Sequence, residues 1–272
     1  MIITGAWFLL IAGLGISSVI SIIRSLILGH FATHLYFILG LFIACLGIEL
    51  VLLLSLKSQV KTYATAWKSV GSSSQKDFIY VAMGDSAAQG IGASNINKGY
   101  VKIIADLISD KSGRRVTIIN ISKSGAKLND MMKDQLPQLK NLKPNLITVD
   151  IGANDITGGT SDKQMEQELK LIIRSVNSYP TVFANLPDFM WGKEQRNTKS
   201  INKVIADSCA KNGVALADLH YETMKTMWRT NEFAADGFHP SNTGHKTWAK
   251  AFTRVLNGVT SVDTNRILPL AP

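Results

Sequence analysis

Residues 78–88 read FIYVAMGDSAA, a short apolar run followed by Gly84, Asp85 and Ser86. The run from Phe78 to Met83 has the length and composition of a strand buried in a parallel sheet. A serine that follows such a strand at the start of a helix lies at the sheet edge, beside the positive end of the helix dipole. Ser86 is therefore a candidate nucleophile, although this pattern alone also fits a serine that only caps a helix.

Similar apolar runs recur beyond residue 88 and alternate with helical patterns. Residues 165–176, for example, carry apolar side chains at the spacing of one helix face. Strands that alternate with helices predict a parallel sheet covered on both sides. The predicted fold is α/β, a three-layer sandwich with a five-stranded parallel sheet, over residues 77–258. The other predicted strands are 116–121, 146–151, 181–185 and 214–219, and the other predicted helices are 98–110, 128–140, 196–211 and 243–257.

Glycine and amide residues follow two further predicted strands. In parallel sheets the ligand crevice lies beyond the carboxyl ends of the strands, so we expect these residues near Ser86. Gly125 follows the second strand, where a glycine lets the backbone approach a ligand and present its N–H. Asn154 follows the third strand, and Asp155 beside it is expected to cap a helix or a local turn.

The last polar segment, residues 236–240, reads DGFHP. His239 precedes a proline and is therefore expected in a loop. Asp236, three residues earlier, can reach the imidazole within a tight turn. His220 and His245 have no such carboxylate beside them in the sequence, so we interpret them as structural.

Together these four segments resemble the SGNH/GDSL hydrolase family, over roughly residues 78–257. That family combines a flavodoxin-like sheet with four sequence blocks. The blocks supply a serine nucleophile, a glycine, an asparagine, and a histidine with an aspartate three residues before it. The matching residues here are Ser86, Gly125, Asn154, His239 and Asp236. One departure is Ala87, where the family often has a larger apolar residue, which affects the shape of the pocket but not the chemistry.

These residues predict a serine hydrolase that cleaves an acyl ester through an acyl-enzyme. His239 would take the proton of Ser86 during attack, and Asp236 would hold the imidazole in the correct tautomer. The backbone N–H groups of Ser86 and Gly125 and the amide of Asn154 form the predicted oxyanion hole. This chemistry requires no cofactor and no metal.

The predicted substrate is a small-molecule or lipid acyl ester, such as a lysophospholipid or an O-acetylated glycan. Two alternatives stay open, an acyltransferase that uses the same triad and a non-catalytic membrane scaffold with a hydrolase fold. The scaffold is disfavoured because decay of function should have removed at least one of the five residues. Met190 and Trp191 form an apolar loop tip that could border the acyl pocket, with core packing or a plain exposed loop as the alternatives.

The first 56 residues predict a hairpin of two transmembrane helices, and hence a multi-pass protein of the cell membrane. No charged residue occurs in 3–23 or in 35–48, and with Glu49 tolerated the second run continues to Leu56. Each run reaches the roughly 20 residues needed to cross a bilayer. A signal peptide would have a basic start, whereas no Lys or Arg precedes Trp7. A buried hairpin of a soluble protein is the other alternative.

Residues 57–76 contain four lysines, no acidic residue and three consecutive serines, which predicts a basic juxtamembrane linker. It would lie on anionic lipid headgroups or act as a solvated tether. The lysines favour a cytoplasmic catalytic domain, whereas many relatives in the resembling family act outside the cytoplasm, so the membrane face stays open. Residues 259–272 show no periodicity and predict a loose tail.

Composition excludes several other classes of protein. The chain has 272 residues, of which 46% are hydrophobic, so it can bury a core. Its two cysteines, Cys45 and Cys209, provide neither a disulfide framework nor a cysteine metal cluster. The net charge of +9 comes entirely from residues 57–272, but no basic helix with interleaved aromatic residues predicts nucleic-acid binding. Acyl length, head group and oligomeric state cannot be read from the sequence.

Overall fold

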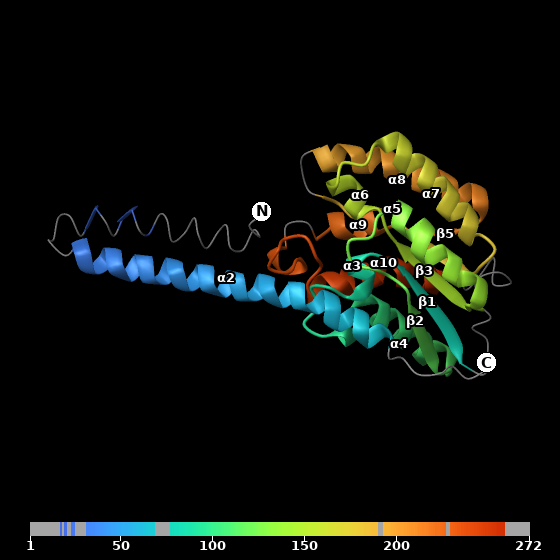
Figure 1. Cartoon of the computed structure of the whole chain (residues 1–272), viewed down its shortest axis with the longest axis horizontal. Coiled ribbons are helices and arrows are strands. Elements are labelled where there is room, and N and C mark those ends of the chain that lie inside the picture. Colours follow the sequence, from blue (N-terminus) through green and yellow to red (C-terminus); the bar gives the residue numbers. More distant parts are fainter. Residues whose placement is uncertain are drawn as a thin grey trace.

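A five-stranded parallel sheet lies between two layers of helices in the computed structural model (Figure 1). The structure describes residues 17, 19–20, 23–24, 31–68, 77–189, 193–226 and 229–258. The strands lie in the order β2-β1-β3-β4-β5. Their bounds are Phe78–Gly84 for β1, Val116–Asn120 for β2, Leu146–Asp150 for β3, Thr181–Ala184 for β4 and Ala215–Ala217 for β5.

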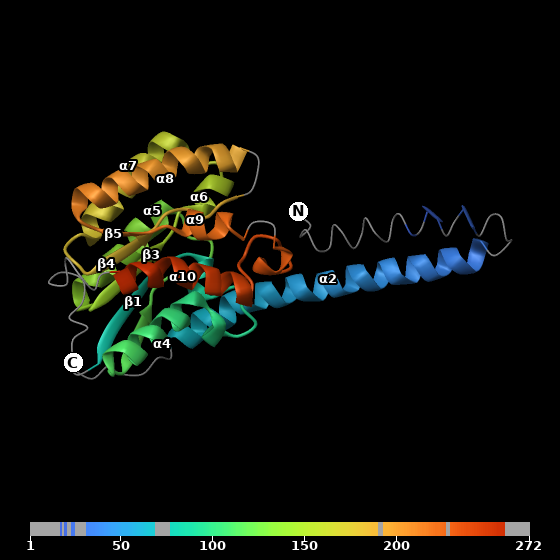
Figure 2. The same ribbon diagram turned by 180° about the vertical axis from the view of Figure 1, so that it is seen from behind.

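Apolar side chains on both faces of the sheet form two cores. The helices α4 (Tyr100–Ser112) and α10 (Asn242–Gly258) cover one face, and α7 (Asp162–Val176) and α8 (Lys193–Asn212) cover the other (Figure 2). Because both faces are covered, β3 and β4 are buried along their whole length. The shorter elements are α3 (Ser86–Gln89), η1 (Ile96–Lys98), α5 (Leu128–Asp130), η2 (Met131–Gln135), η3 (Leu136–Asn141), α6 (Ala153–Thr157), α9 (Leu219–Met224) and η4 (Thr230–Glu232).

All five predicted strands are confirmed, with ends that shift by at most two residues. Most predicted helices are also present, but the one expected over residues 128–140 is divided into α5, η2 and η3. Pro137 lies in the first turn of η3, where its missing N–H and fixed ring are incompatible with a continuous α-helix. The predicted α/β class and parallel sheet are therefore correct, and the prediction of one continuous helix over residues 128–140 is wrong.

The chain changes direction around β1, and this positions the crevice. β2 pairs with β1 on one side and β3 on the other, with Gly84 opposite Asp150. Connections that leave a strand toward opposite sides open a crevice at the carboxyl ends of the strands. The segments that follow β1 and β3 therefore lie at this crevice.

A long helix, α2 (Phe31–Lys68), extends away from the sheet (Figure 1). Within the described residues, one helix, Leu35–Lys68, is long and apolar enough to cross a membrane. It lies near the N-terminus, where a signal sequence meets the same criteria. The first predicted span, residues 3–23, falls almost entirely outside the described residues, so the structure shows one candidate span where two were predicted.

The end of α2 overlaps the first part of the predicted linker, residues 57–76. Residues 57–68 continue the helix, and Leu56 and Tyr63 in the last turns of α2 are buried against the α/β body. This segment has no Gly or Pro to end a helix, and its contact residues recur on one helix face. The three serines and the tail from 259 lie outside the described residues.

Candidate active site

The end of β1 places Ser86 at the crevice. A Cβ added to Gly84 would lie 2.3 Å from the backbone oxygen of Asp150, so the close approach of β3 requires a glycine there. Asp85 then caps α3, because its carboxylate accepts the N–H of Ala87 at 3.0 Å. Ser86 is thus the first residue of α3, and its own N–H has no acceptor within the helix.

Asp236 and His239 lie in a tight turn that brings them to Ser86. One carboxylate oxygen of Asp236 accepts the N–H groups of Phe238 and His239, both at 3.0 Å. The other lies 2.5 Å from His239 Nδ1, and His239 Nε2 lies 2.9 Å from Ser86 Oγ. Burial raises the pKa of Asp236, but the hydrogen bonds and charge of His239 outweigh it, so this pKa lies below its usual value. The structure therefore joins these three predicted residues in a hydrogen-bonded series.

Gly125 and Asn154 lie on the loop after β2 and at the start of α6. Gly125 has a φ of +78°, and a Cβ added to it would meet nothing within 4 Å. The Asn154 amide donates to Asp85 Oδ2 at 3.2 Å and to the backbone oxygen of Ala126 at 3.1 Å. Asn154 is thus next to both the Ser86 segment and the Gly125 loop, but both of its N–H groups are directed at these two acceptors.

Gln89 joins the Ser86 helix to the Gly125 loop. Its side-chain nitrogen donates to the backbone oxygen of Ser122 at 3.1 Å, and its oxygen accepts the N–H of Ser124 at 3.2 Å. Gln89 is 4% exposed, so these bonds form in a buried environment. The sequence analysis missed this residue, since a lone glutamine three positions after a serine belongs to none of the four blocks.

A cavity of about 190 Å³ opens beside Ser86 and His239. For comparison, an apolar cavity of about 150 Å³ holds a benzene ring. Gly125 and Asn154 are not among the residues that line it. The cavity wall is mostly apolar and includes Pro187, Phe189, Phe233, Phe238 and Trp248. Of the predicted loop tip, Met190 and Trp191 lie outside the described residues.

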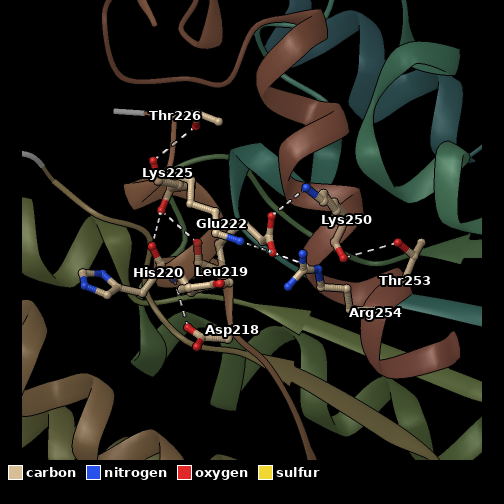
Figure 3. Close-up of polar contacts among 11 residues, drawn as sticks. Asp218, Leu219, His220, Glu222, Lys225, Thr226, Lys250, Thr253 and Arg254 are labelled. Atoms are coloured by element: carbon tan, nitrogen blue, oxygen red, sulfur yellow. Dashed lines mark hydrogen bonds and ion pairs between the residues drawn. The ribbon is translucent and has the colours of Figure 1, made fainter. Parts of the chain in front are cut away.

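An ion-pair cluster fixes the helix that carries Trp248. Glu222 on α9 is 2% exposed and pairs with Lys250 Nζ at 3.3 Å and with Arg254 Nε at 2.9 Å, both on α10 (Figure 3). A buried carboxylate requires such cationic partners. The cluster therefore holds α9 against α10, and α10 brings Trp248 to the cavity.

Two buried aspartates, Asp85 and Asp150, also line the cavity. Burial raises the pKa of both carboxyls, and the charge of Asp150 raises that of Asp85 further. Hydrogen bonds of Tyr100 and Trp248 act to lower the pKa of Asp150, but burial outweighs them. The sequence analysis missed Asp150, although a charged residue at the end of the buried run LITVD was an available signal.

The remaining candidates have structural contacts. His245 is fully buried, accepts the N–H of Tyr100 at 3.3 Å and reaches the oxygen of Ile91 at 3.1 Å. Burial lowers the pKa of His245 to about 4, so it is neutral at pH 7. Asp155 accepts the N–H of Leu128 at 3.0 Å, and so binds the start of α5 rather than capping its own helix. No group of three or more His, Cys, Asp or Glu suited to a metal occurs in the described residues.

A parallel α/β sheet with a hydroxyl, an imidazole and a carboxylate in series at its carboxyl edge is typical of an ester hydrolase. The chain belongs to the GDSL-like lipase/acylhydrolase family, whose sequence model matches residues 82–247, more than half of the chain. The resemblance found in the sequence is thereby confirmed. No curated protein matches the chain.

Several solved structures share the fold, and two of them are named as esterases. The psychrotrophic esterase EstA from Pseudoalteromonas sp. has a TM-score of 0.57 and 17% identity over 68% of this chain and 100% of its own. The acetylxylan esterase Axe2 from Geobacillus stearothermophilus has a TM-score of 0.56 and 18% identity over 69% and 95%. TesA has a TM-score of 0.58 and 21% identity over 66% and 99%. At such identities the likeness establishes the fold alone.

Proposed function

We propose that this protein is a membrane-anchored serine hydrolase that cleaves an acyl ester through an acyl-enzyme. The observation that carries the proposal is the 2.9 Å separation between Ser86 Oγ and His239 Nε2, with Asp236 bonded to the other imidazole nitrogen. A serine hydroxyl is a weak nucleophile at neutral pH and requires an adjacent base. The carboxylate holds the Nδ1–H tautomer, which leaves Nε2 free to accept the Ser86 proton.

The reaction proceeds in two halves. Ser86 Oγ attacks the acyl carbonyl carbon while its proton moves to His239, and the tetrahedral intermediate then expels the alcohol, which takes that proton. Water repeats the sequence on the acyl-enzyme, and the product acid leaves. The negative oxygen of each intermediate needs donors, for which we propose the N–H groups of Ser86 and Gly125 and the amide of Asn154. Asn154 must exchange its bond to Asp85 or Ala126 to serve this oxygen.

The proposed substrates are lipid or O-acetyl esters at a membrane surface. The apolar cavity beside Ser86 supports an acyl or alkyl group there. The apolar part of α2 ends at Leu56, which packs on Ile91 in the loop after the Ser86 helix. This contact keeps the site close to the level at which the anchor leaves the bilayer.

An alkaline carbonate wash of membranes tests the proposed anchor. We expect the full chain to remain in the membrane fraction after this wash.

A fluorophosphonate probe and a p-nitrophenyl ester test the proposal. We expect Ser86→Ala to lose labelling and esterase activity, because the nucleophilic oxygen is absent, and to melt at the wild-type temperature. Ser175→Ala, an exposed serine on α7, serves as the matched control and should keep both signals. Unchanged ester turnover by Ser86→Ala would refute the assignment. Acyl esters of increasing chain length then separate deacetylation from lipid hydrolysis.

A further inference from the structure

The C-terminal turns of α2, residues 56–68, contact both loops that carry the proposed catalytic residues. We call them the docked segment. Leu56 and Tyr63 form a buried apolar cluster with Ile91, and Ala234 and Ala235 pack against it. Ile91 follows the Ser86 helix, and the two alanines directly precede Asp236. One cluster therefore connects the docked segment to the nucleophile loop and to the histidine loop.

Three side chains of the docked segment also bind the backbone of residues 89–93, which we call the elbow loop. Gln59 Oε1 accepts the N–H of Gly92 at 2.9 Å. Tyr63 donates its hydroxyl to the oxygen of Ala93 at 2.9 Å, and Trp67 donates its indole N–H to the oxygen of Gln89 at 3.0 Å. A flexible tether would not supply side-chain hydrogen bonds to three of the five residues of a loop. The helix thus holds this loop at both ends and near its middle.

The elbow loop lies directly against the proposed base. A Cβ added to Gly92 would be 2.2 Å from the backbone oxygen of Pro240 and 3.1 Å from His239 Cβ. The backbone at Gly92 is therefore in contact with the segment His239–Pro240. His245 on α10 also contacts this loop, because its Nε2 lies 3.1 Å from the backbone oxygen of Ile91. The position of His239 is therefore set by a loop that is held between α10 and the docked segment.

We propose that the docked segment is a positioning element of the active site, in which Gln59 and Tyr63 hold the elbow loop against His239. This inference rests on the proposed function. A displacement of about 1 Å in a catalytic group can lower the rate by as much as about 100-fold. A membrane helix that only tethers the domain would leave hydrolysis of a water-soluble ester unaffected.

The test compares substitutions on the docked face with one on the exposed face of the same helix, in the full chain in detergent micelles. Gln59→Leu keeps the size of the side chain but leaves the Gly92 N–H without an acceptor, and Gln59→Glu keeps an acceptor. Tyr63→Phe removes only the hydroxyl. Lys61→Ala is the matched control, because Lys61 is exposed between them.

With a short-chain p-nitrophenyl ester, we expect the Gln59→Leu/Tyr63→Phe double variant to lower kcat about tenfold with KM within twofold. Labelling of the double variant by the fluorophosphonate should slow in parallel. Gln59→Glu should restore most of the rate that is lost in Gln59→Leu. Lys61→Ala should match the wild type in both measurements. Wild-type kcat and labelling in the double variant would overturn the inference.

Two further outcomes separate this inference from the proposed function. A wild-type chain that neither labels nor hydrolyses refutes the function itself, whereas an active wild type with unaffected variants refutes only the role of the docked segment. If the double variant does not fold, Tyr63→Phe decides. A kcat at the wild-type level in Tyr63→Phe, with an unchanged melting temperature, would then count against positioning.

Discussion

Asp236 and the pair Asp85–Asp150 are acidic groups on two sides of the same site, yet their pKa values shift in opposite directions. Burial raises the pKa in both places. At Asp236, His239 and two backbone N–H groups stabilise the carboxylate and more than offset burial. At Asp85 burial is the largest cause and the charge of Asp150 adds to it, whereas at Asp150 burial outweighs the hydrogen bonds of Tyr100 and Trp248.

This contrast shows that residue type does not determine the protonation state in this site. A carboxyl with an imidazole partner stays charged at neutral pH and can stabilise an imidazolium. The buried carboxyls of Asp85 and Asp150 instead retain a proton to a higher pH. Substitution of the acidic residue in each environment should therefore have different effects on activity and on the pH dependence of stability.

The largest effect is expected for Asp236→Asn. This change keeps the shape of the side chain but removes the carboxylate that holds the Nδ1–H tautomer of His239, so kcat should fall by about 10⁴-fold. Steady-state kinetics with a soluble p-nitrophenyl ester measure it, with the melting temperature to confirm folding. Asp150→Asn provides the comparison within the same site and should leave at least a tenth of the activity. A loss below tenfold in Asp236→Asn would contradict the role of this carboxylate.

A smaller loss is expected for Asn154→Ala, which removes a donor that now binds Asp85. If the amide turns to the oxyanion in the transition state, kcat should fall by about 10²–10³-fold with little change in KM. Asn177→Ala, an exposed asparagine after α7, is the control. An effect confined to KM would mean that Asn154 binds the ground-state substrate instead.

Sequence alone predicted the sheet and the residues at its edge for one physical reason. Strands buried on both faces are continuous apolar runs, so Phe78–Met83 and the run that ends at Asp150 could be recognised without any partner. Residues directly after those runs must share an edge, which explains why Ser86 and Asn154 could be proposed together, whereas His239 was added to them by the resemblance to the family. At these residues, the local sequence pattern also indicates where in the fold the residue lies.

The cavity wall and the docked segment could not be predicted in the same way. Phe189, Phe233 and Trp248 come from three separate elements, and their common cavity exists only in the folded chain. Gln59 and Tyr63 stand among lysines, which are typical of a solvated tether, and their partners lie about thirty positions further along the chain. Contacts between elements far apart leave no periodic signal in the sequence.

The smallest expected effect concerns the stability of Asp150→Asn as a function of pH. A carboxyl whose pKa is higher in the folded than in the unfolded state binds protons more tightly when folded. Its stabilising contribution is therefore complete below the unfolded pKa near 4 and is lost as the pH rises toward neutrality. Removing the ionisable group should stabilise the protein more at pH 8 than at pH 5.

Each unit of raised pKa corresponds to about 1.4 kcal/mol. We therefore expect the free energy of unfolding of Asp150→Asn, relative to that of the wild type, to be larger at pH 8 than at pH 5 by at least about 1 kcal/mol. Urea unfolding at both pH values measures this difference. Asp236→Asn should show no such gain between these two pH values, because its folded pKa is lowered, so its contribution is complete at both and is lost only as the pH falls below about 4. A gain of the same size in Asp236→Asn between pH 5 and pH 8 would contradict the difference between the two acidic environments.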